Sequence, residues 1–206
     1  MNNDLTEYRP TNASELFGAS PRKWAKVLEN KVSRMRKNGS GRLKALLIGN
    51  PGVGKTSIAE FTSSALVDSH FAIRESNGAD VSAELVREVS TEAYSSSMFS
   101  DFRVWIINEI DSMKRVAQDL MLTFLDKLPD RYAVIGTSNY DTAEITERFQ
   151  SRFQQMRIKS PEPREVSDGL QSLGIPMKVA DAITKCTKGN VRSALLDAQS
   201  YLDTRN

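Results

Sequence analysis

The chain has 206 residues, enough for one ordinary domain or for one domain with a small satellite. Apolar residues make up 39% and charged residues 26%, so a real core can form, and the net charge of +2 indicates no particular partner. With one cysteine and one histidine, an internal disulfide and a Cys/His zinc cluster are excluded. No N-terminal signal segment and no apolar run long enough for a bilayer is seen, so we expect a cytoplasmic protein without a membrane partner.

Strands and helices alternate along the first 160 residues. The pattern predicts helices at 21–37, 55–67, 82–94 and 116–128, and strands at 43–49, 70–76, 103–110, 132–139 and 154–159. The first and third of these strands are nearly continuously apolar, as expected for strands buried on both faces. The alternation predicts an α/β fold with a five-stranded parallel sheet and helices on both faces.

The pattern changes after "SPEPREV" (160–166) to helices alone, at about 163–172, 176–187 and 190–203. So short a segment cannot build a sizeable core of its own. We therefore expect a nucleotide-binding domain at 1–160 and a small helical lid at 161–206. Basic residues predominate between Arg22 and Lys44, which usually marks a solvated face.

A phosphate-binding pattern lies at the end of the first strand. "GNPGVGKTSIAEF" (49–61) fits G-x-x-x-x-G-K-[ST], with a strand before it and a helix after it. Glycines let backbone N–H groups turn toward phosphate, and the helix adds its positive end. The pattern predicts bound ATP and Mg²⁺, with Lys55 on the β- and γ-phosphates and the Thr56 hydroxyl on the metal. The residues expected around the nucleotide here are Asn50, Pro51, Gly52, Val53, Gly54, Lys55, Thr56 and Ser57.

Acidic residues follow the apolar strand "VWIINEID" (104–111) at the sheet edge where ligands bind in parallel sheets. Glu109 is our candidate to orient and deprotonate the attacking water. Asn108 stands where an aspartate usually holds Mg²⁺ through its water shell. An amide accepts hydrogen bonds but supplies no charge, so we expect slow hydrolysis or weak Mg²⁺ binding. On this basis Asn108→Asp is expected to strengthen Mg²⁺-dependent activity.

Three further polar side chains are candidates near the phosphates. Asn139 ends the strand "GTSN" (136–139) and would hold the attacking water or the γ-phosphate. Arg152, like Arg148, belongs to "RFQSRF" and would be offered to a neighbouring protomer's γ-phosphate as an arginine finger. Arg192 begins a lid helix and would contact phosphate from the lid. Each of these, taken alone, is also typical of a turn or a surface.

Together these segments resemble the AAA+ ATPases, and among them the clamp-loader subunits of the replication-factor-C type. The resemblance covers most of the chain, because each segment occurs in the family's order. The similar segments are "LTEYRPTNASELFG" (5–18), "GNPGVGKTSIA" (49–59), "ESNGAD" (75–80), "NEIDSM" with "AQDLM" (108–121), "TSNY" (137–140), "QSRF" (150–153) and "GNVRSAL" (189–195).

The resemblance implies a role for individual residues. Tyr8, Arg9 and Pro10 would border the adenine. Lys55 and Thr56 would serve phosphate and Mg²⁺, Glu109 would be the catalytic base, and Asn139 and Arg192 would be sensors of the nucleotide.

The resemblance also implies partners. Arg152 would act in trans on the ATP of the next protomer, in a homo- or hetero-oligomer that is pentameric or hexameric. Primer–template DNA would lie against the inner-face helices, where Arg87, Lys114 and Arg115 fall on the matching segments. The alternative, given equal weight, is that these three are ordinary solvated residues on the surface of their helices.

Three departures from the family pattern stand out. Asn108 replaces an aspartate, and Phe153 follows Arg152 where the family has cysteine. Family subunits also carry a C-terminal helical collar, which is absent from the 206 residues. Two readings fit. One is a collar-less protein encoded by a phage or a plasmid, which in the phage case acts in the host cytoplasm, and the other is a fragment of a longer chain. Assembly is then expected to rest on the ATPase interfaces, with ATP and DNA holding the oligomer.

The function expected is that of an ATP-dependent AAA+ ATPase of DNA replication, which acts on a sliding clamp with primer–template DNA. One alternative is an AAA+ ATPase that acts on a replicative helicase or a transposition complex. The other is a switch that binds ATP, assembles on DNA and scarcely hydrolyses ATP, as Asn108 suggests.

Overall fold

The computed structural model describes residues 4–95, 100–139 and 145–204. They form two compact units. The lid unit consists of Met1–Val27, Gly49–Ile58 and Ile158–Asn206, and the sheet unit consists of Leu28–Ile48 and Ala59–Arg157.

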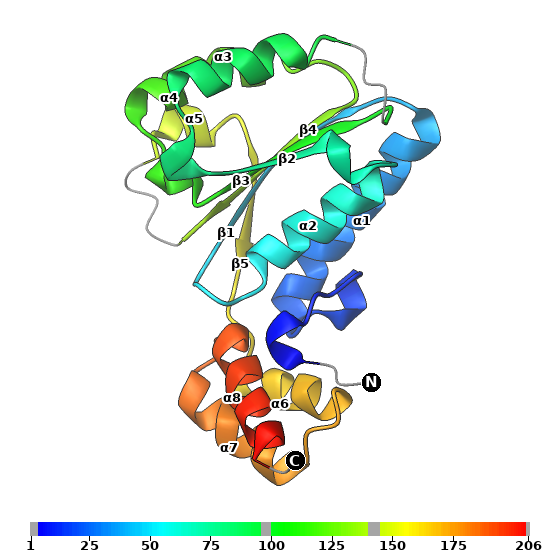
Figure 1. The fold of residues 1–206 in the computed structure, drawn as a ribbon, viewed down its shortest axis with the longest axis vertical. Helices are drawn as coiled ribbons and strands as arrows, with labels where there is room; N and C mark the ends of the chain where they lie inside the picture. The colour runs from blue at the N-terminus through cyan, green and yellow to red at the C-terminus, as the bar shows by residue number, and fades with distance from the viewer. Residues whose placement is uncertain (1–3, 96–99, 140–144, 205–206) are drawn as a thin grey trace. The chain divides into compact units, whose positions relative to one another are not determined.

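A five-stranded sheet forms the centre of the sheet unit (Figure 1). Its strands are β1 (Arg42–Gly49), β2 (Ile73–Asn77), β3 (Arg103–Asn108), β4 (Tyr132–Ser138) and β5 (Gln154–Ile158). The order across the sheet is β2-β3-β4-β1-β5, and β1 with β4, β3 with β4 and β2 with β3 pair in parallel. The predicted α/β fold with a five-stranded parallel sheet is confirmed.

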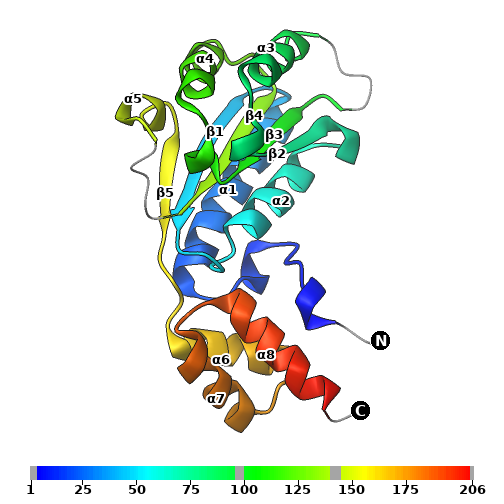
Figure 2. The ribbon, with the colours of Figure 1, turned by 60° about the vertical axis from the view of Figure 1, so that its left-hand side comes forward.

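Helices cover both faces of this sheet (Figures 1 and 2). One face carries α1 (Ala19–Asn38) and α2 (Lys55–Leu66), and the other carries α3 (Ala83–Glu92) and α4 (Arg115–Asp126). Between the sheet and α3 and α4, a core forms around Trp105, whose ring centroid lies 6.3 Å from that of Phe124. Trp105 is fully buried, as expected of a core residue rather than a base-stacking platform.

Two predicted strands are too long, for local reasons. The strand expected from residue 70 begins at Ile73, because Ser69 caps a 3₁₀ turn over His70–Ala72. The strand expected to reach residue 110 ends at Asn108, because Glu109 turns the chain with a left-handed backbone at φ 50°. A short helix, α5 (Glu147–Gln150), was not predicted, and Thr146 caps its first turn.

The lid unit has three helices, α6 (Pro163–Ser172), α7 (Met177–Thr187) and α8 (Val191–Asp203). They lie within one residue of the predicted lid helices. Their apolar faces share a core with the N-terminal segment through Leu5 and Phe17. A lid of this size therefore completes its core with chain from the far end of the sequence. The predicted domain boundary after residue 160 stays a prediction.

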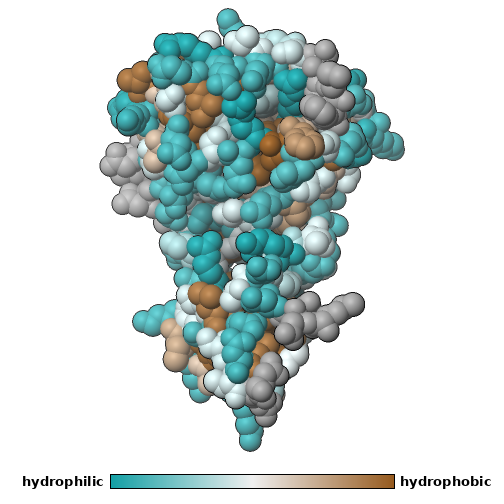
Figure 3. Space-filling model, viewed as in Figure 1, coloured by the Kyte–Doolittle hydropathy of each residue, from teal (hydrophilic) through white to brown (hydrophobic). Residues whose placement is uncertain are grey.

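The face of the molecule drawn in Figure 3 is mostly hydrophilic, with small separate hydrophobic patches. Within the described ranges, no helix has the length and apolar character that crossing a bilayer requires.

Candidate functional site

The phosphate-binding loop belongs to the lid unit and runs from the end of β1 to the start of α2. Gly52 and Gly54 have φ angles of 77° and 92°, which side-chain-bearing residues rarely adopt. At Gly49, a Cβ would lie 2.6 Å from the carbonyl oxygen of Ile158. The glycines at these positions are therefore required by the shape of the loop.

Lys55 occupies the inside of this loop. The residue is 9% exposed, and its Nζ donates hydrogen bonds to the carbonyl oxygens of Gly49 at 2.6 Å and Asn50 at 2.9 Å. Both acceptors are neutral, so these bonds orient the ammonium group without cancelling its charge. Together with the N-terminus of α2, where Thr56 and Ser57 lie half-buried, the loop presents positive charge suited to phosphate. The donor set thus fits a nucleotide triphosphate.

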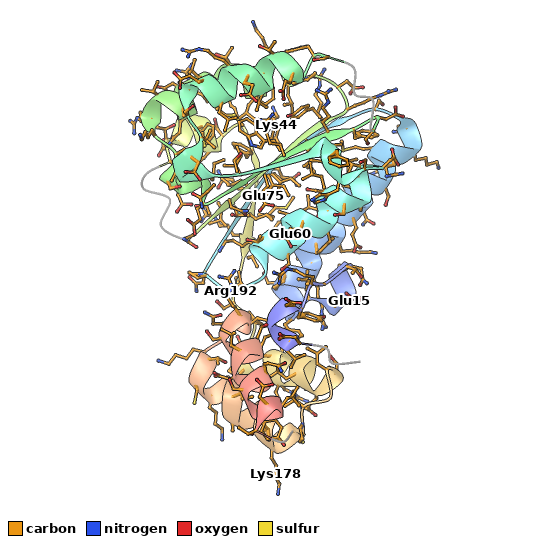
Figure 4. All side chains as sticks on the ribbon, in the orientation of Figure 1. Glu15, Lys44, Glu60, Glu75, Lys178 and Arg192 are labelled. Atoms are coloured by element: carbon orange, nitrogen blue, oxygen red, sulfur yellow. The ribbon has the colours of Figure 1, made fainter. Side chains whose placement is uncertain are left out.

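The loop is joined to the first turn of α8 by a backbone hydrogen bond. Gly52 accepts, through its carbonyl oxygen, a 3.0 Å bond from the N–H of Val191. Asn190 caps α8 by accepting a 3.1 Å bond from the N–H of Ser193. Arg192, the residue after Val191, is exposed at the start of this helix and is labelled in Figure 4. Arg192, the lid residue predicted to sense phosphate, is therefore the neighbour in sequence of Val191, whose N–H is bonded to the loop.

The N-terminal segment packs in the same unit. Tyr8 is half-buried, stacks on Phe17 with ring centroids 6.0 Å apart, and donates a 2.9 Å hydrogen bond to the carbonyl oxygen of Glu15. Burial raises the pKa of the Tyr8 hydroxyl, and the negative charge of Glu15 raises this pKa further, so the hydroxyl stays neutral. Pro10 is buried, and Arg9 is exposed. The structure therefore brings the segment expected at the adenine into the unit that holds the phosphate loop.

A chain of hydrogen bonds crosses three strands at the carboxyl edge of the sheet. The N–H of Glu109 donates to Thr137 Oγ1 at 3.1 Å, and Thr137 Oγ1 donates to Asn108 Oδ1 at 3.2 Å. Asn108 Nδ2 in turn donates to Glu75 Oε1 at 2.5 Å. This chain runs from β4 through β3 to β2, so the amide of Asn108 is held on both sides.

Glu109 is held in the same network. Asn77 Nδ2 lies 3.4 Å from its Oε2 atom, and Ser112 donates to its carbonyl oxygen from N at 2.8 Å and from Oγ at 2.7 Å. Its left-handed backbone is unusual for a residue with a side chain, and such conformations gather at functional sites. Asn139 directly follows β4 and is half-buried, whereas Tyr140 of the same motif lies outside the described residues.

Arg152 is paired within its own chain. Its Nε and Nη2 atoms bind Asp126 Oδ1 at 2.9 Å and Oδ2 at 3.2 Å, and its side chain is 28% exposed. The hydrogen bond from Arg152 lowers the pKa of Asp126, with smaller effects of Lys44 and Arg148, so this carboxyl group is ionised. The guanidinium group is partly exposed, and reaching another protomer would require it to leave Asp126.

The three basic residues expected to contact DNA are all exposed. Arg87 lies on α3, where Glu84 is 3.8 Å away, and Lys114 and Arg115 begin α4. Helices α3 and α4 pack together on the same face of the sheet. Basic side chains at the surface of neighbouring helices suit a phosphate backbone, but they are also what solvated helices carry.

Residues 45–161 match the model of the ATPase family associated with various cellular activities, AAA. This range is more than half of the 206 residues and contains the loop, the acidic strand end and Arg152. The chain belongs to the AAA family. It is therefore an ATPase that uses ATP and Mg²⁺.

Solved structures share the AAA fold along nearly the whole chain. The RuvB Holliday junction branch migration motor of Thermotoga maritima matches 97% of this chain with a TM-score of 0.76 at 19% identity. Single-residue variants of the same protein match 95%, with TM-scores of 0.75 at 19% identity and 0.74 at 20% identity. This chain spans 66% of the length of RuvB. Identity this low shows the fold alone. Among curated proteins, no sequence matches the chain.

The assignment to the AAA family identifies ATP and Mg²⁺ as the ligands that the phosphate loop and Lys55 would bind. Within the described residues, no three His, Cys, Asp or Glu side chains form a group able to hold a metal ion. Mg²⁺ usually keeps several waters and binds through few protein oxygens plus phosphate. In the lid unit, the Thr56 hydroxyl would serve it, and when bound it stabilises the charge of the phosphates. Asn108, the other predicted Mg²⁺ residue, belongs to the sheet unit.

Sequence reasoning missed the side chains that hold the predicted ones. Glu75, Asn77 and Thr137 contact Asn108 or Glu109, yet none was a candidate. The sheet order was needed to find them, since β2 and β4 flank β3 but lie far from it in sequence. The sequence signals were that each lies at or next to the end of a predicted strand, and that all three fall within the similar segments "ESNGAD" and "TSNY".

Proposed function

We propose that this AAA ATPase is a DNA-acting assembly factor of the clamp-loader type. Its protomers associate through ATP, act on a sliding clamp with primer–template DNA, and release their partners after hydrolysis. It works in the cytoplasm, as a homo- or hetero-oligomer of five or six protomers.

The proposed roles follow from the motifs and from the family resemblance. Lys55 and the loop amides bind the phosphates, and the carboxylate of Glu109 takes the proton of the attacking water. Asn139 and Arg192 act as sensors of the nucleotide, as the resemblance implies. Arg152 exchanges Asp126 for the phosphate of a neighbouring protomer, where its planar donors suit a charged oxygen cluster.

One observation carries the proposal. The lid unit unites the "EYRP" segment, the phosphate loop and α8, and the loop is bonded directly to the helix that bears Arg192. A change of phosphate state at the loop would therefore be transmitted to the lid. Motifs from residue 5 to residue 195 follow the clamp-loader order, which favours a loader over other AAA clients.

The DNA contact is proposed from the exposed cations on α3 and α4. Contacts with the phosphate backbone are blind to sequence and weaken steeply with salt. Charge reversal at Arg87, Lys114 and Arg115 together should therefore lower DNA affinity and flatten its salt dependence, by about one unit of slope for each lost phosphate contact. RuvB, whose name describes a branch migration motor, makes a four-way junction the informative competitor.

ATP hydrolysis measured with different effectors tests the proposal. The arms are primed DNA, primed DNA with a sliding clamp, a four-way junction, and a replicative helicase. The proposal expects primed DNA to stimulate hydrolysis and the clamp to stimulate it further. Greater stimulation by the junction or by the helicase would contradict the clamp-loader role, and only the ATPase assignment would remain. The control for the charge reversal on α3 and α4 is Lys178→Glu with Lys185→Glu on lid helix α7. This control variant should show the same DNA affinity and the same stimulation of hydrolysis by each effector as the wild type.

A further inference from the structure

The guanidinium group of Arg152 is bonded on every nitrogen within its own chain. Arg152 lies just after α5 and Asp126 ends α4, and these two helices contact each other in the sheet unit (Figures 1 and 2). Arg152 Nε and Nη2 donate to the two carboxylate oxygens of Asp126, at 2.9 Å and 3.2 Å. Arg152 Nη1 donates to Ser151 Oγ at 3.0 Å and to the carbonyl oxygen of Arg148 at 3.4 Å. The donors that a phosphate would need are therefore already in use.

The surroundings of Asp126 hold it in place and keep it ionised. Lys44 Nζ donates a 3.2 Å hydrogen bond to the carbonyl oxygen of Leu125, the residue before Asp126, and so fixes the last turn of α4. Lys44 is labelled in Figure 4. The hydrogen bond from Arg152 lowers the pKa of the Asp126 carboxyl group, and the positive charges of Lys44 and Arg148 lower it further. Asp126 is therefore an anion at neutral pH, placed to accept from Arg152.

The pair lies at the surface, so it can open without leaving a buried charge unpaired. The side chain of Arg152 is 28% exposed and that of Asp126 is 50% exposed. A surface ion pair with good two-point geometry typically favours its closed form by about 2- to 5-fold. The contact between Asp126 and Arg152 therefore biases the position of the guanidinium group but does not lock it.

One guanidinium group cannot bind Asp126 and a phosphate group at the same time. The two parallel N–H donors that match a carboxylate also match two oxygens of a phosphate. Asp126 therefore occupies the donors that the proposed contact in trans would use. When only a fraction of the molecules is in the competent form, the apparent affinity falls by that fraction.

We propose that Asp126 is an internal competitor for Arg152, which holds it in the separate protomer and so raises the protein concentration needed for hydrolysis between protomers. The inference rests on the proposed role of Arg152 in trans and adds the regulation of that contact. The competitor raises this concentration by about 2- to 5-fold, the bias of the surface pair. Protomers then remain apart when they are dilute, and a neighbour that carries ATP releases Arg152 from Asp126.

The test is a complementation assay of ATP hydrolysis, in which two variants each supply one half of the contact. Lys55→Ala supplies Arg152 but should bind no ATP, and Arg152→Ala binds ATP but supplies no guanidinium group. Their mixture should hydrolyse ATP much faster than either variant alone. Asp126→Asn added to the Lys55→Ala chain should lower the concentration of that chain at half-maximal activity by about 2- to 5-fold. The same substitution in the Arg152→Ala chain should change nothing, because the competitor acts only on its own chain.

Asp119→Asn is the matched control, because it removes another exposed carboxylate from α4 and should leave the half-maximal concentration unchanged. Asp126→Ser should act in the same direction as Asp126→Asn, and thermal unfolding of each variant checks the fold. An inactive mixture would contradict the role of Arg152 in trans, and the inference would fall with it. An active mixture in which Asp126→Asn leaves the half-maximal concentration unchanged, raises it, or acts equally from both chains would overturn the inference alone.

Discussion

The contact between the phosphate loop and the lid predicts a specific cost for Gly52→Ala. Gly52 has a φ of 77°, a left-handed conformation that costs an alanine about 1–2 kcal/mol. A Cβ at Gly52 would also lie 2.0 Å from Asn190 Oδ1, too close for the side chain to stay in place. That oxygen caps α8, so its displacement forfeits a cap that typically contributes about 1 kcal/mol. The sum is about 2–3 kcal/mol of unfolding free energy.

Gly174→Ala separates strain from the lost cap. Gly174 has a φ of 89°, and a Cβ there would meet nothing within 4 Å, so only the backbone strain applies. Urea unfolding of both variants should show that Gly52→Ala loses about 1 kcal/mol more than Gly174→Ala. In an Asn190→Ala background, which has already lost the cap, the difference should vanish. Equal losses in the wild-type background would refute the contact between Gly52 and Asn190.

Three further predictions concern the nucleotide. Lys55→Ala should abolish binding of a fluorescent ATP analogue, because its ammonium group is the buried charge of the loop; unchanged affinity would contradict the loop assignment. Glu109→Gln should retain ATP but stop phosphate release, and turnover at the wild-type rate would remove Glu109 as the base. Arg152→Ala should bind ATP normally and hydrolyse it about a thousandfold more slowly if it acts in trans. Hydrolysis per protomer in the wild type should then rise with protein concentration, and a constant rate would exclude that role.

The fold was predictable because its signals are local. Apolar runs such as "ALLI" and "VWII" mark buried strands, and Pro163 at the start of α6 marks the helix that opens the lid. Errors arose where a polar side chain redirected the backbone. Ser69 caps a 3₁₀ turn in a segment whose composition favours a strand, and Glu109 takes a left-handed conformation that its residue type does not favour.

The candidate site was predictable only in part, because side-chain partners depend on which strands are neighbours. Asn108 illustrates this. Only the pairing of β2 with β3 brings Glu75 to it, 33 residues away in sequence. Asp126 and Arg152 are likewise 26 residues apart, and nothing in either motif indicates that they pair.

The central claim is that ATP joins protomers of this AAA ATPase and that DNA stabilises the assembly. The molecular mass in solution tests it most directly, measured with ADP, with a non-hydrolysable ATP analogue, and with that analogue plus primed DNA. The account predicts a monomer with ADP and an oligomer of five or six protomers with the analogue and DNA, which Arg152→Ala weakens. A monomer under all three conditions, or the same oligomer with ADP, would contradict it.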